Sequence, residues 1–227
     1  MSIKDTIQFI RKMGTTVPEI IDVLELKRNV FAPFLGGLAE IKLRNQYFDH
    51  PQISNYHNAP DHNRTKKYDW GVTYKDQLIR IENKSVQKNT VKREHDFNGN
   101  EVAIGEAQFK SSDPQTVPGY QDETAINARS GGFDILAVST WRLNDEWSFI
   151  FARMDELPEA TSSKIPAELH HQYIKNPLPV KYPPEEPYTT DLYGLMDDIV
   201  ADREAGKIPE PNQANLDQYQ YTSQSPE

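Results

Sequence analysis

The sequence predicts an α/β fold in which helices flank a central mixed β-sheet. Up to residue 48, apolar side chains recur at the spacing of an amphipathic helix. From residue 69 onward they alternate with a period of two, as in half-buried strands. The segment 133–140 contains the unbroken apolar run Ile135-Leu136-Ala137-Val138, which is typical of a strand buried on both faces. Helices followed by strands of both kinds favour an α/β or α+β arrangement.

The individual elements follow from these periods. Helices are expected over 3–10, over 17–26 after Val17-Pro18-Glu19, and over 35–48. Strands are expected at 69–74, 77–86, 102–110, 133–140 and 146–153, the first two forming a hairpin around Lys75-Asp76. A short helix is expected at 166–174.

The C-terminal part is expected to be separate from the body. Residues 1–176 are predicted to be the domain proper, with its helical segment first, and 177–189 a proline-rich linker. Residues 190–206 read as an amphipathic helix that packs on the body or pairs with a partner chain, and 207–227 as a disordered acidic tail.

Composition excludes several classes of function. The chain has 227 residues and no cysteine, which removes disulfides, thiol nucleophiles and Cys-ligated metal sites. No apolar stretch approaches the roughly 18 residues of a membrane span, and the first ten residues do not resemble a signal peptide. A soluble, cytoplasmic protein without a membrane partner is expected.

Charge at first argues against nucleic acid as a partner, because the net charge is −9. The acidity is uneven, however. Residues 178–227 hold three bases and ten acids, a net charge of −7, whereas 59–94 hold nine bases and five acids, a net charge of +4. We therefore expect bases around the face of the 69–86 hairpin, with the tail acids away from it.

That hairpin carries the main candidate for chemistry. Along its second arm Arg80, Glu82 and Lys84 share one face, because side chains alternate along a strand. A tight hairpin brings Asp69 back toward the last two. Two carboxylates suit Mg²⁺, for which Mn²⁺ can substitute, and a lysine beside them can orient or deprotonate a bound water or offset charge on phosphorus.

These residues resemble the signature of the PD-(D/E)XK nuclease superfamily, which includes most type II restriction endonucleases. Tyr68-Asp69 stands in place of the usual Pro-Asp, followed by Glu82-Asn83-Lys84. Gly36-Gly37-Leu38-Ala39-Glu40 resembles the first core helix of these nucleases, with small residues that permit close packing. The resemblance covers roughly residues 35–153 and extends to Gln108-Phe109-Lys110 and to the run from Ser130 to Val138.

The resemblance implies a restriction-endonuclease-like core and a type II site-specific deoxyribonuclease. Asp69 and Glu82 would bind Mg²⁺, Lys84 would manage the attacking water, and Glu40 would assist at the metal. Contacts to double-stranded DNA would come from Lys88, Lys92, Arg93, Gln108 and Lys110. A homodimer would cut both strands, and a DNA methyltransferase would be the companion enzyme.

Three alternatives remain open. Asp96, Glu106 and Gln108 mimic the Glu-x-Gln variant of the same signature on the next strand. The protein could instead be a nuclease of repair, junction-resolving or RNA-directed type. A different class is a non-catalytic interaction module, in which the hairpin charges form a solvated ion-pair face and the acidic tail is the working part.

Overall fold

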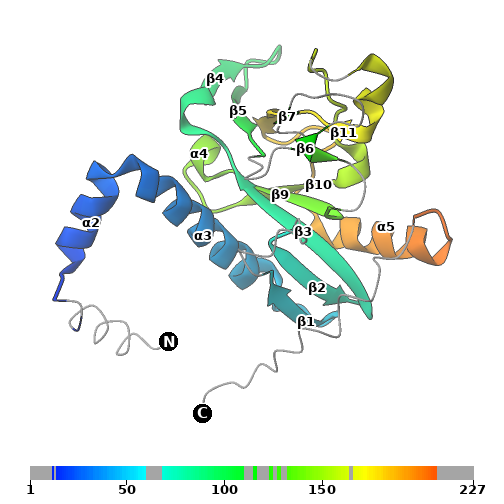
Figure 1. Ribbon diagram of the computed structural model, residues 1–227, viewed down its shortest axis with the longest axis horizontal. Helices are drawn as coiled ribbons and strands as arrows, with labels where there is room; N and C mark the ends of the chain where they lie inside the picture. Colours follow the sequence, from blue (N-terminus) through cyan, green and yellow to red (C-terminus); the bar gives the residue numbers. More distant parts are fainter. Residues whose placement is uncertain are drawn as a thin grey trace.

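The computed structural model describes residues 12, 14–59, 68–109, 115–116, 123–124, 127–128, 132–163 and 166–208 (Figure 1). The helix expected over 3–10 and the tail beyond residue 208 lie outside this part of the chain. No helix in the described part combines the length and the apolar composition needed to cross a bilayer.

A five-stranded sheet forms the centre, in the order β1-β2-β3-β9-β10. β3 and β9 are parallel, and the other neighbours are antiparallel, so the expected mixed sheet flanked by helices is confirmed. The bounds are β1 Ile53–Asn58, β2 Trp70–Tyr74, β3 Gln77–Ser85, β9 Ile135–Ser139 and β10 Phe149–Arg153. The sequence does not predict polar β1, which is an edge strand with mostly exposed side chains.

The hairpin of β2 and β3 forms at the predicted position. Lys75 and Asp76 both have positive φ, at 46° and 63°. Two consecutive residues of this kind make a turn whose twist matches that of the flanking strands. Tyr74 therefore pairs with Gln77, and Trp70 pairs with Ile81 four residues further along each strand. This register determines which side chains meet at the far end of the hairpin.

Two helices cover one face of the central sheet. These are α3, Arg28–Tyr47, and α5, Leu192–Glu204, which lie to the left and right of the sheet in the view of Figure 1. Their shared apolar cluster contains Ala39, Leu43, Ile79, Ile81, Phe149, Phe151, Leu192, Met196, Ile199 and Val200. Burial of this cluster is the main force that holds both helices to the sheet.

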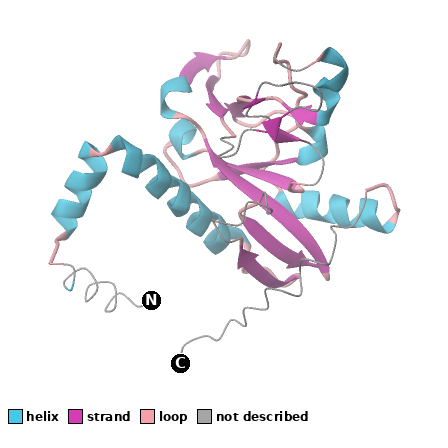
Figure 2. Cartoon of the chain, viewed as in Figure 1, coloured by secondary structure: helices cyan, strands magenta, loops and turns pink. Residues whose placement is uncertain are grey.

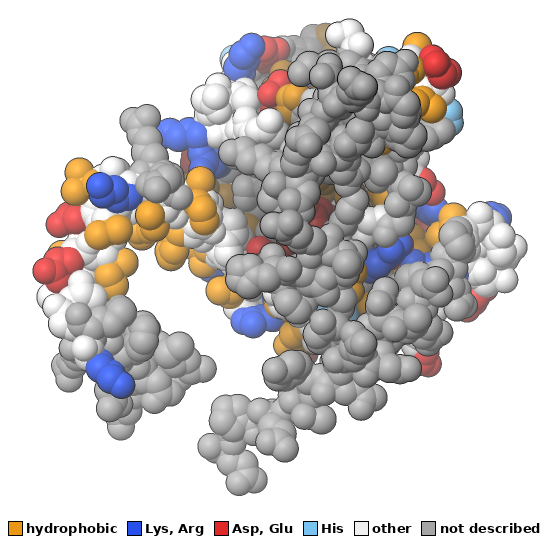
Figure 3. Space-filling model, in the orientation of Figure 1, with side chains coloured by type: hydrophobic (Ala, Val, Ile, Leu, Met, Phe, Trp, Pro, Cys, Tyr) orange, Lys and Arg blue, Asp and Glu red, His pale blue; other side chains and the backbone are white. Residues whose placement is uncertain are grey.

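Helix α2, Val17–Leu26, and the start of α3 project away from the sheets (Figure 1). A capping box begins α2, in which Thr16 and Glu19 bond each other's backbone N–H. Apolar side chains remain exposed along this arm, as Figure 3 shows; Leu26 is 78% exposed and Phe34 47%.

The other face of the central sheet packs against a three-stranded sheet in the order β12-β5-β4. Figure 2 shows β4 and β5 above the central sheet. The bounds of its strands are β4 Lys92–His95, β5 Glu101–Ala107 and β12 Leu178–Tyr182. The short helix α4 spans Trp141–Asn144. The shorter elements are η1 Lys88–Thr90, β6 Gln115–Thr116, β7 Glu123–Thr124, β8 Asn127–Ala128, η2 Met154–Glu156, η3 Ala167–Gln172 and β11 Tyr173–Ile174.

The predicted boundary at residue 176 and the linker at 177–189 are wrong. Strand β12 pairs with β5 along its whole length, and Thr189 bridges Phe151 of the central sheet. Proline content argues against a strand here, but β12 is an edge strand, where Pro179 loses no ladder bond. Helix α5, expected over 190–206, follows as part of the same core rather than as an appendage.

A buried ionic cluster joins α5 to the junction of β3 and β9. Asp134, just before β9, accepts from the Arg80 backbone N–H at 2.7 Å and from its guanidinium at 2.8 Å. Arg203 of α5 binds the same carboxylate at 2.8 Å and donates to the Leu78 carbonyl at 2.7 Å. The Arg203 side chain is 1% exposed. One carboxylate therefore joins β3, β9 and α5.

Candidate functional site

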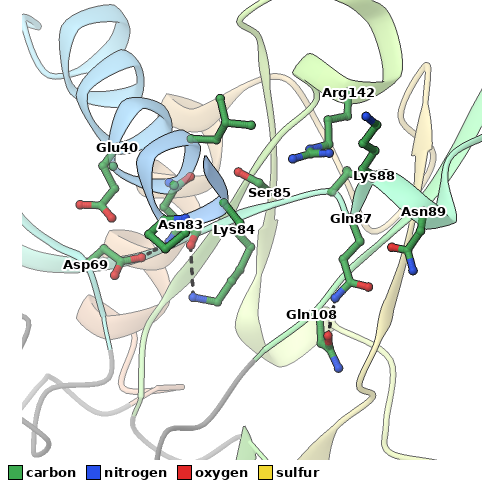
Figure 4. Close-up of a pocket in the computed structure, with 16 residues that line it drawn as sticks. Glu40, Asp69, Asn83, Lys84, Ser85, Gln87, Lys88, Asn89, Gln108 and Arg142 are labelled. Carbon is green, nitrogen blue, oxygen red and sulfur yellow. Dashed lines mark hydrogen bonds between the residues drawn. The ribbon is translucent and has the colours of Figure 1, made fainter. Parts of the chain in front are cut away.

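A pocket of about 710 Å³ opens between α3, the far end of the β2–β3 hairpin and α4. Five of the residues predicted from the sequence line it: Glu40, Asp69, Lys84, Lys88 and Gln108. Figure 4 shows Glu40 and Asp69 on one side of this pocket and the Lys84 amine between them and Gln108. The pocket is thus built from residues that lie far apart in the chain.

Backbone pairing sets the position of Asp69. Its N–H donates to the Ile81 carbonyl at 3.0 Å, which extends the hairpin ladder by one residue beyond β2. Its carboxylate accepts from the Asn83 N–H at 2.6 Å. The side chain is therefore directed across to β3, between the two positions that carry Glu82 and Lys84.

Glu82 and Lys84 lie on the same face of β3 and form an ion pair with each other. Their side chains are 15% and 21% exposed. The Lys84 amine also donates to the Asn83 carbonyl at 3.2 Å and lies 5.6 Å from the centre of the Phe109 ring. These charges are largely buried, so the solvated ion-pair face of the non-catalytic alternative is wrong.

The charges in this cluster shift the pKa of both members of the pair. Burial raises the pKa of Glu82 to about 7; the Lys84 charge opposes this rise, and the charges of Asp69 and Glu40 add to it. Burial alone would lower the pKa of Lys84, but the charges of Glu82, Asp69 and Glu40 outweigh it and raise that pKa. The raised pKa favours the cationic form of Lys84, which can orient a bound water or offset charge on phosphorus.

Glu40 reaches the pocket from α3. The Asn58 side chain of β1 donates to its carboxylate at 3.2 Å, while its neighbours Ala39 and Leu43 pack into the core. Gly36 and Gly37 do not serve close packing as expected, because a Cβ at either position would meet no atom within 4 Å. These two residues line the pocket instead and leave its wall open.

The predicted DNA contacts divide into three groups. Lys88 and Gln108 line the pocket, where Gln108 accepts from the Gln87 amide. Lys92 and Arg93 lie on β4 and do not line it; Arg93 binds Glu101 at 2.6 Å and Asp145 at 3.5 Å. Lys110 lies outside the described residues.

The alternative triplet of Asp96, Glu106 and Gln108 does not form a site. Asp96 closes the turn between β4 and β5, where its carboxylate accepts from the N–H groups of Asn98 and Asn100 at 2.8 Å each. Glu106 lies near the other end of β5, roughly 17 Å along the strand at its usual rise. The two carboxylates therefore cannot share a ligand.

The acidic residues of α5 lie away from the pocket, as expected. Asp197 binds Lys75 at 2.6 Å, and Asp202 binds Arg153 and Lys207 at 2.8 Å each. The ionic partners of these two acids come from the hairpin turn, from β10 and from just beyond α5, so neither acid reaches into the pocket.

Arg142 of α4 is a pocket residue that the sequence did not indicate. It follows a buried strand and lies in a helix of four residues, with no motif around it. The sequence also did not indicate Gln87 and Asn89 at the same end of the pocket. A helix of four residues is too short to show a repeating pattern of apolar residues, so the sequence around Arg142 does not reveal it.

The side chains around the pocket decide whether a metal ion such as Mg²⁺ could bind there. Among the described residues, no three His, Asp or Glu side chains lie close enough to surround a metal ion. Mg²⁺, however, usually takes one or two carboxylates and completes its shell with water and substrate phosphate oxygens. Asp69 and Glu82 suit that partial donor set, with Glu40 near enough to influence both charges of the ion pair.

Comparison of the chain with protein-family models, with curated proteins and with solved structures found no match.

Proposed function

We propose that this protein is a Mg²⁺-dependent endonuclease that hydrolyses phosphodiester bonds of duplex DNA, with a restriction-endonuclease-like core. The observation that carries the proposal is the meeting of Asp69 and Lys84, from two paired strands, with Glu40 from α3 around one pocket. Glu82 does not line this pocket itself but forms an ion pair with Lys84, which does. Burying a lysine beside three acidic side chains costs desolvation energy, and groups with pKa values perturbed in this way cluster at functional sites.

Each residue has a role that its surroundings support. Asp69 and Glu82 would hold the metal, which when bound acts as a Lewis acid and lowers the pKa of water. Lys84, a cation in this pocket, would offset the negative charge that develops on phosphorus and donate a hydrogen bond to the attacking water. Glu40 would bind a water molecule coordinated to the metal, or add negative charge next to the metal site.

The wider proposal is a type II restriction endonuclease. Such an enzyme cuts both strands, which a homodimer achieves by placing two pockets on a two-fold target. In the cytoplasm it would need a companion DNA methyltransferase that protects the host's own sites. A repair or junction-resolving nuclease would use the same pocket on a different DNA shape.

A digest tests the proposal directly. Wild-type protein with Mg²⁺ is expected to cut plasmid DNA from a broad panel, methylated and unmethylated, into discrete fragments, and EDTA is expected to prevent this. Duplex, junction and single-stranded substrates in competition separate the restriction enzyme from the other nucleases. Intact DNA across the whole panel would count decisively against nuclease function.

Metal binding is expected to strengthen as the pH rises through about 7. The pKa of Glu82 is raised to about 7, so below this pH its carboxyl is mostly protonated and competes with the cation. Lys84 stays charged over the same range because its pKa is raised as well. Calorimetric titration with Mn²⁺ between about pH 6 and about pH 8 measures the affinity.

The control for this titration is Glu82→Gln, which removes the titrating group. It is expected to bind Mn²⁺ weakly and without a pH dependence in this range. A wild-type affinity that stays constant from pH 6 to pH 8, within the measurement error, would show that Glu82 is not a ligand.

A further inference from the structure

The pocket has two ends of opposite charge. Glu40, Asp69 and Lys84, which is paired with Glu82, lie at one end, and Figure 4 shows Arg142 and Lys88 at the other, beside Gln87, Asn89 and Gln108. The acidic end is the proposed catalytic centre. The basic end takes no part in breaking the bond. Lys88 and Gln108 are expected DNA contacts there, whereas Arg142 has no role yet.

Arg142 differs in its partners from the other buried or paired arginines. Arg80, Arg93, Arg153 and Arg203 each bind at least one carboxylate. Arg142 has no ion pair or hydrogen bond to any residue in the part of the chain that the structure describes. Burial lowers its pKa, so part of its hydration is lost without a protein anion in return.

The geometry of a guanidinium suggests what completes this end of the pocket. A planar guanidinium presents a fork of N–H donors that matches the oxygens of a phosphate, and it stays charged at neutral pH. Lys88 adds an exposed, flexible ammonium beside it. Asn89 and Gln87 can donate further hydrogen bonds from their amides. The chemistry of this end is that of a phosphate binder.

We propose that Arg142 and Lys88 form a phosphate subsite, which binds the phosphodiester next to the one positioned beside Asp69 and Lys84. This inference rests on the proposed function and describes the path of the substrate strand through the pocket. A polynucleotide carries phosphates at regular intervals, so one strand can place a phosphate at each end at once. A free phosphate or a mononucleotide can occupy one end at a time.

The experiment is a DNA-binding titration with the full chain in EDTA, so that no cleavage occurs. Wild type, Arg142→Gln, Lys88→Gln and the control Lys207→Gln are titrated with a short mixed-sequence duplex over a range of salt. The Lys207→Gln variant loses the same charge, but Lys207 lies just beyond α5, outside the pocket, and is paired with Asp202. Circular dichroism checks that each variant is folded, and Arg142→Lys tests the need for the planar fork.

Arg142→Gln is expected to weaken binding roughly tenfold, as the loss of a charged hydrogen bond does, and to reduce the slope of log affinity against log salt by about one. Lys88→Gln is expected to lower the slope similarly, and Lys207→Gln to match wild type. Inorganic phosphate is expected to compete weakly with DNA on wild type and not on Arg142→Gln. If Arg142→Gln has the affinity and slope of Lys207→Gln, the subsite does not exist.

The two proposals fail in different ways. A wild type that cleaves plasmid, together with an Arg142→Gln variant that binds and cleaves equally well, removes the subsite and keeps the nuclease. A wild type that never cleaves, but whose DNA affinity depends on Arg142, removes the nuclease and keeps the subsite. Phosphate binding at Arg142 without any duplex binding would show a small-anion site and overturn the strand path proposed above.

Discussion

Replacing Asp134 with alanine is expected to lower the free energy of unfolding by about 3–5 kcal/mol, as the loss of one partner from a buried ion cluster does. The change leaves Arg80 and the fully buried Arg203 without their shared carboxylate. It also removes the bond from the Arg80 N–H that sets the start of the β3–β9 pairing. Urea unfolding followed by circular dichroism measures the loss.

The matched control is Asp145→Ala. Asp145 also pairs with an arginine, Arg93, at 3.5 Å, but its side chain is 84% exposed. Exposed pairs of this kind contribute at most about 1 kcal/mol. If Asp134→Ala is no more destabilising than Asp145→Ala, the cluster does not hold α5 and the sheet together as described.

Lys84→Ala is expected to slow DNA cleavage by about 10²–10³-fold, the usual cost of losing one group that stabilises charge in the transition state. Lys84 contacts Glu82 and the Asn83 carbonyl, and no other residue of the described pocket holds an ammonium at that point. The fold should survive, because Glu82 has a pKa near 7 and can take up a proton when its partner is lost. The rate is measured as single-turnover cleavage with saturating Mg²⁺.

The control here is Lys75→Ala in the turn of the same hairpin. Lys75 forms an exposed pair with Asp197, outside the pocket, and its removal is expected to leave the rate within about twofold. A Lys84→Ala protein that cuts DNA as fast as Lys75→Ala would disprove the site assignment, even if nuclease activity itself is demonstrated.

The sequence is most informative where the fold depends on neighbours in the chain. The β2–β3 hairpin follows from alternating apolar residues on either side of Lys75-Asp76, and its register carries Asp69 to Asn83 without help from elsewhere. For this reason the amino-acid pattern alone brings Asp69, Glu82 and Lys84 together. Strand β9 is equally predictable, because all five of its residues are buried.

The sequence does not predict elements whose structure depends on pairing with strands far away in the chain. Strand β12 looks like a linker until β5 is beside it, since the edge position is what makes Pro179 acceptable. Arg142 reaches the pocket because β9 pairs in parallel with β3, and nothing near residue 142 shows this. The small residues Gly36 and Gly37 suggest packing contacts, whereas the helix face they leave bare is a pocket wall.

The ionic cluster around Asp134 also has a consequence for the order of events during synthesis. Arg203 bonds the carbonyl of Leu78, 125 residues earlier in the chain. A ribosome adds roughly 5–20 residues per second, so the strand that bears Glu82 and Lys84 emerges on the order of ten seconds before its last anchor. A nascent chain therefore completes the scaffold of this pocket only after residue 203 has been added, well after the strand that bears Glu82 and Lys84.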